Sequence, residues 1–183
     1  TAFNIPIYEA GGFEADDVIG TIAAKAKDEV RVVIASGDLD TLQLVDDKRV
    51  LVYTLKKGIQ DTILYDEAAV MARFEFLPKY IPYWKGLRGD PSDNIIGITG
   101  IGEKTATIIV KAFGSLEEFY QALVSDLKKV AALELSDRII GLLREGEEEA
   151  LFSKSLATIR LDAPVDFKLP DNLWLTGLDK KLV

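Results

Sequence analysis

The stretch VRVVIASGDLDTLQL, residues 30–44, decides the fold of this chain. Its first six residues, VRVVIA (30–35), are almost all apolar, which is typical of a strand buried on both faces of a parallel sheet. A Ser-Gly pair ends this run, and apolar residues then recur at helical spacing at Leu39, Leu42 and Val45. We therefore expect a buried parallel strand over 30–35 that leads directly into a short helix.

The flanking segments extend this alternation of strands and helices. On the N-terminal side, the pattern predicts a short strand over 5–8 and a helix over about 14–27. On the C-terminal side, apolar runs at 50–55 and 59–64 flank a Lys-Gly pair at 57–58 and predict a β-hairpin. Strands that alternate with helices in this way predict an α/β layer architecture.

From residue 66 onward the apolar periodicity is helical. The expected helices cover about 66–74, 79–87, 103–113, 116–123, 136–143 and 147–155. In the last of these, the run Glu147 to Glu149 predicts a solvated helix face. Residues 165–183 have little periodicity, and we expect them to pack back over the α/β layer. These patterns predict one α/β body with a closely packed helical second half.

The composition limits the chemistry. The chain contains no cysteine and no histidine, which removes thiolate and imidazole as metal ligands or catalytic bases. Any hydrolysis must therefore use carboxylates, hydroxyls and lysines, and oxygen-liganded cations such as Mg²⁺ or Mn²⁺ are the natural cofactors. No apolar run approaches the roughly 20 residues that span a bilayer, so we expect no membrane partner.

The net charge of −8 argues against a nucleic-acid ligand, since proteins that bind phosphate backbones are usually basic. The charge is unevenly distributed, however, because residues 78–112 contain five basic and three acidic side chains. An acidic patch that holds divalent cations can still face DNA. The composition therefore leaves DNA binding open.

Three clusters of acidic residues are candidates for a metal site. They are Glu14, Asp16 and Asp17 at the start of the first predicted helix, Asp38 and Asp40 just after the predicted buried strand, and Asp90 and Asp93 in a loop between helices. Each cluster alone is also typical of a turn or a helix cap. If all three converge, the repulsion among the carboxylates requires cations, and two divalent ions about 4 Å apart supply them. Such a pair hydrolyses phosphodiester bonds without histidine or cysteine.

The glycine-rich stretch GITGIGEKT, residues 97–105, is a candidate phosphate-binding element. Gly100 and Gly102 allow close backbone approach, and the free N–H groups of the next helix, with Lys104, would hold a phosphate. A turn that only joins two packed helices is the structural alternative. A P-loop is rejected, because Glu103 separates Gly102 from Lys104 and no strand precedes the stretch.

Five ordered motifs carry a resemblance to a known family. They are GFEADDVIGTIA (12–23), SGDLDTLQL (36–44), GLRGDPSDNIIGITGIGEKTA (86–106), FGSLEEFY (113–120) and ALFSKSLATIRLD (150–162). They resemble the 5′ nuclease family of flap endonucleases and, more closely, the 5′–3′ exonuclease domain of bacterial DNA polymerase I. The resemblance runs from about residue 1 to 168. Members of that family carry further residues before the position of Thr1, so we expect the chain to lack the family's N-terminal segment.

The resemblance implies a PIN-like parallel-sheet body followed by a helix-three-turn-helix element. It implies two Mg²⁺ or Mn²⁺ ions, whose ligands correspond to Glu14, Asp16, Asp17, Asp38, Asp40, Asp90 and Asp93. The catalytic residues among these are Asp16, Asp17, Asp38 and Asp40. It also implies a K⁺ ion at the glycine-rich stretch and DNA contacts at Gly97, Thr99, Gly100, Gly102, Lys104 and Thr105.

The resemblance also implies an organisation and a role. We expect an α/β metal-site portion (1–75), a helical DNA-binding portion (76–165) and a C-terminal extension (166–183) packed on the body. The implied activity is that of a 5′–3′ exonuclease or flap endonuclease acting on 5′ flaps, nicks and 5′ ends in DNA replication and repair. We expect a monomer in the bacterial cytoplasm, associated with the nucleoid, with a polymerase domain in the parent protein. The alternatives are an incomplete fragment that only binds duplex DNA, and a PIN-like ribonuclease, which residues 97–105 disfavour.

Overall fold

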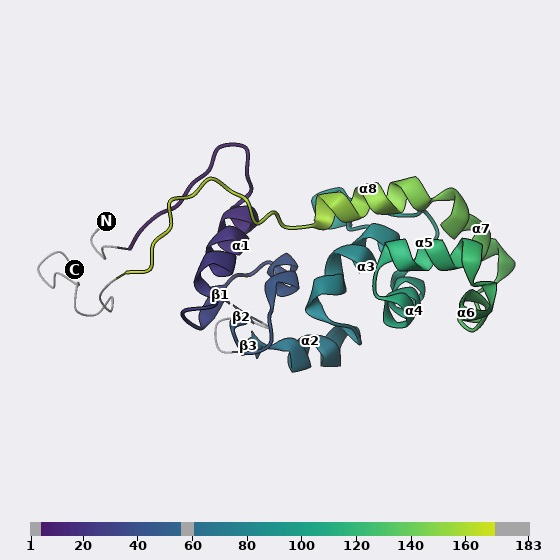
Figure 1. Cartoon of the computed structure of the whole chain (residues 1–183), viewed down its shortest axis with the longest axis horizontal. Coiled ribbons are helices and arrows are strands. Elements are labelled where there is room, and N and C mark those ends of the chain that lie inside the picture. The colour runs from purple at the N-terminus through teal and green to yellow at the C-terminus, as the bar shows by residue number, and fades with distance from the viewer. Residues whose placement is uncertain (1–4, 56–60, 171–183) are drawn as a thin grey trace, which may run out of the picture.

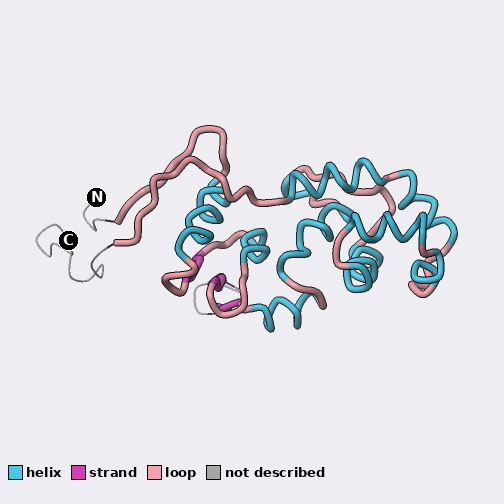
Figure 2. Tube along the Cα trace, viewed as in Figure 1, coloured by secondary structure: helices cyan, strands magenta, loops and turns pink. Residues whose placement is uncertain are grey.

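The computed structural model describes residues 5–55 and 61–170 of the chain. An α/β part lies at one end of the molecule, and helices extend away from it toward the other end (Figure 1). The α/β part contains helix α1 (Ala15–Ala26), strands β1 (Val32–Ala35), β2 (Val50–Leu55) and β3 (Thr62–Tyr65), and the 3₁₀ helix η1 (Leu39–Leu44). The strands gather in this part alone among the described residues, as the magenta segments of Figure 2 show.

The three strands form one sheet in the order β1-β2-β3. β1 pairs with β2 in parallel, with Val32 opposite Val50, and β2 pairs with β3 in antiparallel, with Val52 opposite Tyr65. The predicted α/β architecture and the pairing of the two hairpin strands are therefore confirmed. The Lys-Gly turn predicted at 57–58 lies outside the described residues.

One face of this sheet is exposed in the described part of the chain. Ile34 is 5% exposed and packs in the core with Ala23 of α1, whereas Val33 on the opposite face is 53% exposed. Tyr53 and Leu64 of the neighbouring strands are exposed as well. The prediction of a strand buried on both faces is therefore wrong, because the core residues of α1 pack against one face only.

The strand predicted over 5–8 is also absent. These residues have no regular secondary structure and run beside the segment that follows α8 (Figure 1). The two segments meet through side chains, since the rings of Tyr8 and Phe167 lie 5.9 Å apart, edge to face. Ile5 and Ile7 are 53% and 73% exposed, so this stretch is not the short buried strand that its apolar residues predict.

The helical part confirms the six helices predicted from residue 66 onward. They are α2 (Glu67–Phe74), α3 (Ile81–Arg88), α4 (Glu103–Phe113), α5 (Leu116–Ser125), α7 (Asp137–Glu145) and α8 (Glu147–Ala157). A further helix, α6 (Leu127–Ala131), was not predicted, because five residues are too few to show a period. Two 3₁₀ turns, η2 (Pro78–Tyr80) and η3 (Pro91–Asp93), flank α3. No helix within the described residues is both long enough and apolar enough to cross a membrane.

Helix α3 lies at the centre of the core. Its residues Ile81, Trp84 and Leu87 are buried in the same hydrophobic cluster as the sheet. It packs closely against α8 at Gly86, where an added Cβ would lie 2.7 Å from the carbonyl oxygen of Ala150. This backbone contact fixes α3, and with it the side chains that α3 directs toward the sheet.

After α8 the chain returns to α1. The ammonium of Lys25 donates to the carbonyl of Val165 at 2.8 Å, and the amide of Ala163 donates to the hydroxyl of Thr21 at 3.1 Å. This is the segment for which the sequence predicts packing onto the α/β part. Its residues beyond 170 lie outside the described part.

Two glycine-to-alanine changes should have opposite effects on stability. We expect Gly86→Ala to destabilise the fold by about 1–3 kcal/mol, because the added methyl group has no space between α3 and α8. Gly141→Ala in α7 should stabilise the fold by about 0.5–1 kcal/mol, because nothing lies within 4 Å of its Cβ position and alanine favours a helix. Urea unfolding of both variants measures these changes. Equal effects of the two substitutions would contradict the close α3–α8 contact.

Candidate metal centre

Two carboxylates lie just beyond the carboxyl end of β1. Asp38 caps the 3₁₀ helix η1, since its side chain accepts from the amide of Asp40 at 2.9 Å. The hydroxyl of Ser36 in turn accepts from the amide of Asp38 at 3.0 Å. This end of a parallel strand is where open α/β sheets place their ligands. The tight turn therefore holds Asp38 and Asp40 at a position typical of a functional site.

Two further carboxylates come from the loop after α3. A backbone pair closes this loop, in which the amide of Asp90 donates to the Ile95 carbonyl at 2.8 Å and the amide of Ile95 donates to the Asp90 carbonyl at 2.9 Å. The Asp90 side chain also accepts from the amide of Ser92 at 3.1 Å. The loop is thus held by backbone hydrogen bonds, and it includes Asp93 at the end of η3.

Both pairs line one cavity of about 480 Å³ between η1 and α3. Asp40, Asp90 and Asp93 each offer a carboxylate oxygen there, and these three atoms lie within 4.8 Å of one another. Two arginines, Arg73 and Arg88, also line this cavity. In the part of the chain that the structure describes, this is the one group of three acidic residues close enough to hold a metal ion.

One lysine, Lys85, lies within this acidic group and was not predicted as a site residue. The side chain of Lys85 is 5% exposed, and its Nζ contacts Asp40 Oδ1, Asp90 Oδ2 at 2.6 Å and Asp93 Oδ2 at 3.3 Å. The signal in the sequence is weak, because Lys85 is a lone lysine among the apolar residues of α3 and precedes Asp90 by five positions.

The pKa shifts at this site reflect burial and the charge of Lys85. Burial raises the pKa of Asp40 to about 6, although the hydrogen bond and charge of Lys85 oppose the rise. Burial alone would raise the pKa of Asp90, but the hydrogen bonds from Lys85 and Ser92 lower it overall. Burial disfavours the Lys85 ammonium, yet the hydrogen bonds and charges of Asp40 and Asp90 raise its pKa. The pKa values of Asp40, Asp90 and Lys85 therefore depend on one another, because these three groups are in direct contact.

The structure brings only part of the first acidic cluster to this centre. Burial raises the pKa of Asp16, and the negative charge of Asp38 raises it further, with smaller contributions from its own cluster and from Asp93. Asp16 is therefore close enough to the carboxylates of the site to interact with their charges. Asp17 instead accepts from the amides of Glu14 at 3.1 Å and Arg160 at 2.8 Å. Glu14 is exposed and immediately precedes α1. Asp17 and Glu14 thus lie at the start of α1, where the Asp17 carboxylate binds backbone amides.

The predicted DNA-binding residues lie on the turn before α4 and in the first turn of α4 itself. Four of them, Thr99, Gly100, Gly102 and Lys104, are exposed, and Thr105 is half-buried. Gly102 precedes α4 without a side-chain cap, so the first N–H groups of α4 have no side-chain acceptor at this position.

Gly97 lies inside the protein. Its amide donates to the hydroxyl of buried Ser153 at 3.0 Å, and this hydroxyl donates to a carboxylate oxygen of Glu149 at 2.9 Å. The prediction that Glu147 to Glu149 form a solvated face is therefore wrong for Glu149, which is half-buried. Helix α8 thus holds the glycine-rich stretch from within.

A close crossing of backbone connects this stretch with the carboxylate loop. Gly89 and Gly97 both have positive φ, at 75° and 63°. A Cβ on Gly97 would lie 2.1 Å from the amide nitrogen of Gly89, so no larger residue fits. Because Gly89 immediately precedes Asp90, the carboxylates and the glycine-rich turn form one continuous unit.

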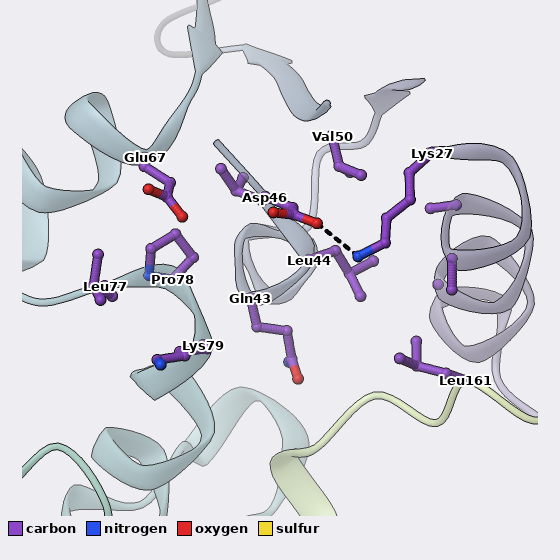
Figure 3. A pocket seen from close by; sticks show the side chains of 14 residues that line it. Lys27, Gln43, Leu44, Asp46, Val50, Glu67, Leu77, Pro78, Lys79 and Leu161 are labelled. Carbon is purple, nitrogen blue, oxygen red and sulfur yellow. Dashed lines mark hydrogen bonds and ion pairs between the residues drawn. The ribbon is translucent and has the colours of Figure 1, made fainter. Parts of the chain in front are cut away.

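A second cavity, of about 350 Å³, lies between α1, η1 and η2 (Figure 3). Lys27 and Asp46 pair across it at 2.6 Å, drawn as the dashed line. The amide of Gln43 donates to the Ala157 carbonyl and accepts from the Ile159 amide, both at 3.0 Å. These polar groups are paired within the protein, so the carboxylate cavity is the stronger candidate for a functional site.

Two family models match the chain. The model described as 5′–3′ exonuclease, N-terminal resolvase-like domain, matches residues 1–75. The model described as 5′–3′ exonuclease, C-terminal SAM fold, matches residues 76–181.

Curated relatives agree with these models. The chain is 42% identical over 183 residues to DNA polymerase I of Bacillus caldotenax, and 43% identical over 171 residues to DNA polymerase I of Chloroflexus aurantiacus. The alignments cover 100% and 92% of this chain, but only 20% and 17% of those proteins. The chain thus spans about a fifth of the length of these relatives.

Solved structures share the fold. T5 5′-exonuclease with bound zinc superposes with a TM-score of 0.69 at 23% identity, over 84% of this chain and 53% of that chain. The catalytic core of Rad2 in complex with DNA substrate gives a TM-score of 0.52 at 16% identity, over 93% and 56% of the two chains. The predicted fold class, an α/β body with a helical second half, is confirmed. On the evidence of the family models that match residues 1–75 and 76–181, this chain belongs to the 5′–3′ exonuclease family.

Proposed function

We propose that this chain carries a metal-dependent nuclease site that hydrolyses DNA phosphodiester bonds at 5′ ends, nicks and 5′ flaps. The observation that carries the proposal is the convergence of Asp40, Asp90 and Asp93, whose carboxylate oxygens lie within 4.8 Å of one another. Asp90 and Asp93 lie in a loop that is continuous with the glycine-rich turn. A DNA backbone held at that turn would lie beside the carboxylates. Membership of the 5′–3′ exonuclease family supports this reading.

The donor set suits hard divalent cations. All the candidate ligands are carboxylate oxygens, which favours Mg²⁺ or Mn²⁺ over softer metals. Asp40, Asp90 and Asp93 would hold one ion, and Asp16 with Asp38 would hold a second. Two such ions lower the pKa of a bound water and stabilise the attacking and leaving oxygens of the phosphodiester.

Glu14 and Asp17 complete the proposed ligand set at the edge of the site. Asp17 also accepts a hydrogen bond from the Arg160 amide, and this bond holds the segment after α8 against α1. We also propose that Arg73 and Arg88, which line the carboxylate cavity, contact the substrate phosphate.

The proposed DNA grip is built from backbone and a few side chains. Thr99, Gly100 and Gly102 let the phosphate approach the free N–H groups of α4, and Lys104 with Thr105 supplies side-chain contacts. Gly97 supports the turn from inside through Ser153. Main-chain carbonyls of the turn would hold a K⁺ ion. None of these contacts reads a base, so the grip would not depend on sequence.

We propose that residues 1–75 form most of the metal site and that residues 76–165 bind DNA. Residues 166–183 would pack on the body. The carboxylates of Asp90 and Asp93 come from the second portion, so the two portions would complete one site together. The relatives are DNA polymerases, which supports a polymerase domain in the parent protein and a role in bacterial DNA replication and repair. We propose that the chain acts as a monomer in the cytoplasm, at the nucleoid.

Asp38→Asn should abolish metal-dependent cleavage of a labelled 5′-flap DNA. Asparagine keeps the cap on η1 but removes the negative charge that would hold the metal. Cleavage is measured with Mg²⁺, with Mn²⁺ and with chelator, and it should fall to the chelator level. The exposed Asp28→Asn is the matched control and should cleave like the unsubstituted chain. Equal cleavage with chelator, or full activity of Asp38→Asn, would disprove the proposed site; no cleavage with retained duplex binding would leave the chain as a DNA-binding module.

Lys104→Ala should weaken binding to duplex DNA, because it removes one proposed phosphate contact in the first turn of α4. The slope of log affinity against log salt should become shallower by about one unit. Fluorescence anisotropy at several salt concentrations measures this slope. Lys48→Ala, which removes an exposed lysine of the α/β part, is the control. An equal loss for both variants would indicate a general effect of net charge instead of a contact at Lys104.

A further inference from the structure

Lys85 is the one charged side chain that is buried among the described residues. A buried ammonium is costly unless each of its three N–H groups has an acceptor. Here the carboxylates of Asp40, Asp90 and Asp93 supply three acceptors, at a nearly dry position on α3. The lysine is thus fully paired within the protein.

The acceptors of Lys85 are also the proposed ligands of a divalent cation. The oxygens that the three carboxylates offer lie within 4.8 Å of one another. Mg²⁺ approaches its oxygen ligands to about 2.1 Å, and Mn²⁺ takes ligands of the same kind. The ammonium already lies 2.6 Å from Asp90 Oδ2. An ammonium and a metal ion that bind the same carboxylate oxygens would lie close enough to repel each other strongly. The two cations therefore compete for the same place.

The backbone of α3 cannot move to resolve this competition. Gly86, the next residue, packs against the carbonyl of Ala150 in α8, and Trp84, the preceding one, is buried with its indole N–H donating to Thr107 at 3.0 Å. The side chain of lysine, in contrast, has a flexible four-carbon stem. The ammonium is therefore the part that must move.

We infer that Lys85 is the internal counterion of this metal centre: in the metal-free protein its ammonium occupies the place of a divalent cation between Asp40, Asp90 and Asp93, and binding of that cation displaces it. This inference rests on the proposed function, since it assumes a divalent cation at the centre. It makes Lys85 a residue that stabilises the metal-free fold and weakens the affinity for metal. A lysine that served only packing or solubility would have neither effect.

The first test compares metal binding in three proteins. Isothermal titration with Mn²⁺ is carried out on the unsubstituted chain, on Lys85→Met and on Lys79→Met. Methionine removes the charge and keeps an unbranched side chain, and Lys79 is an exposed lysine on η2 that undergoes the same charge change. We expect Lys85→Met to bind Mn²⁺ at least about tenfold more tightly than the other two proteins, because a competing charge has been removed.

Thermal unfolding gives a readout that is independent of activity. In chelator, Lys85→Met should melt about 5–10 °C below the unsubstituted chain, because three neighbouring carboxylates lose their cation. Saturating Mn²⁺ should recover most of this loss. Lys79→Met should melt like the unsubstituted chain in both conditions.

A second measurement needs no substitution and therefore does not depend on the folding of a variant. The unsubstituted chain is treated with an acylating reagent in chelator and in Mn²⁺, and the modified lysines are quantified by mass spectrometry. Lys85 should be protected in chelator and should react several times faster once Mn²⁺ is bound, because the freed ammonium leaves its buried pairs. Lys79 should react equally in both conditions.

The outcomes separate this inference from the proposed function. If the unsubstituted chain binds no Mn²⁺, the proposed metal centre is wrong, and the inference is overturned with it. If it binds Mn²⁺ but Lys85→Met binds no more tightly and acylation of Lys85 does not change, only the role of Lys85 is overturned. If Lys85→Met does not fold, the acylation measurement alone decides.

Discussion

The contact between the Lys85 ammonium and three carboxylates is the interaction on which the rest of the site depends. Asp40 is positioned by the turn after β1, and Asp90 and Asp93 by the loop after α3. The lysine itself is positioned by the close contact of α3 with α8 at Gly86. The ion pairs therefore join the sheet and the helical part at the point where the chemistry would occur. A buried charge without partners is strongly destabilising, so neither part can shift without losing this pairing.

The elements that could be predicted from the sequence are those set by local patterns. Apolar periodicity and caps define the helices of the second half, and Asp66 shows how, since its side chain accepts from the amide of Ala69 at the start of α2. The errors concern features that depend on packing between distant segments. The exposure of Val33 depends on which elements cover the sheet, and residues 5–8 pack beside the segment around Phe167 instead of forming a strand. No period along the chain carries that information.

The same distinction applies to the candidate site. Carboxylates at the end of a predicted strand and glycines before a predicted helix are visible in the sequence, because both types of site depend on local backbone geometry. The position of Lys85 depends on how α3 packs between η1 and α8, which the residues around Lys85 in the sequence do not specify. The buried position of Gly97 and the partial burial of Glu149 could not be predicted for a related reason: buried Ser153 lies between them, and it connects two segments that are far apart in the chain.

The crossing of Gly89 and Gly97 has a consequence for where the chain would cut. Seven residues lie between the two glycines in the chain, and the crossing of their backbones leaves no room for a side chain on either glycine. In the proposed nuclease, the distance from a phosphate held at the turn to a phosphate beside Asp90 and Asp93 would be set by this short peptide segment. Backbone geometry would then set the position of incision along the DNA. That position would not vary with the base sequence.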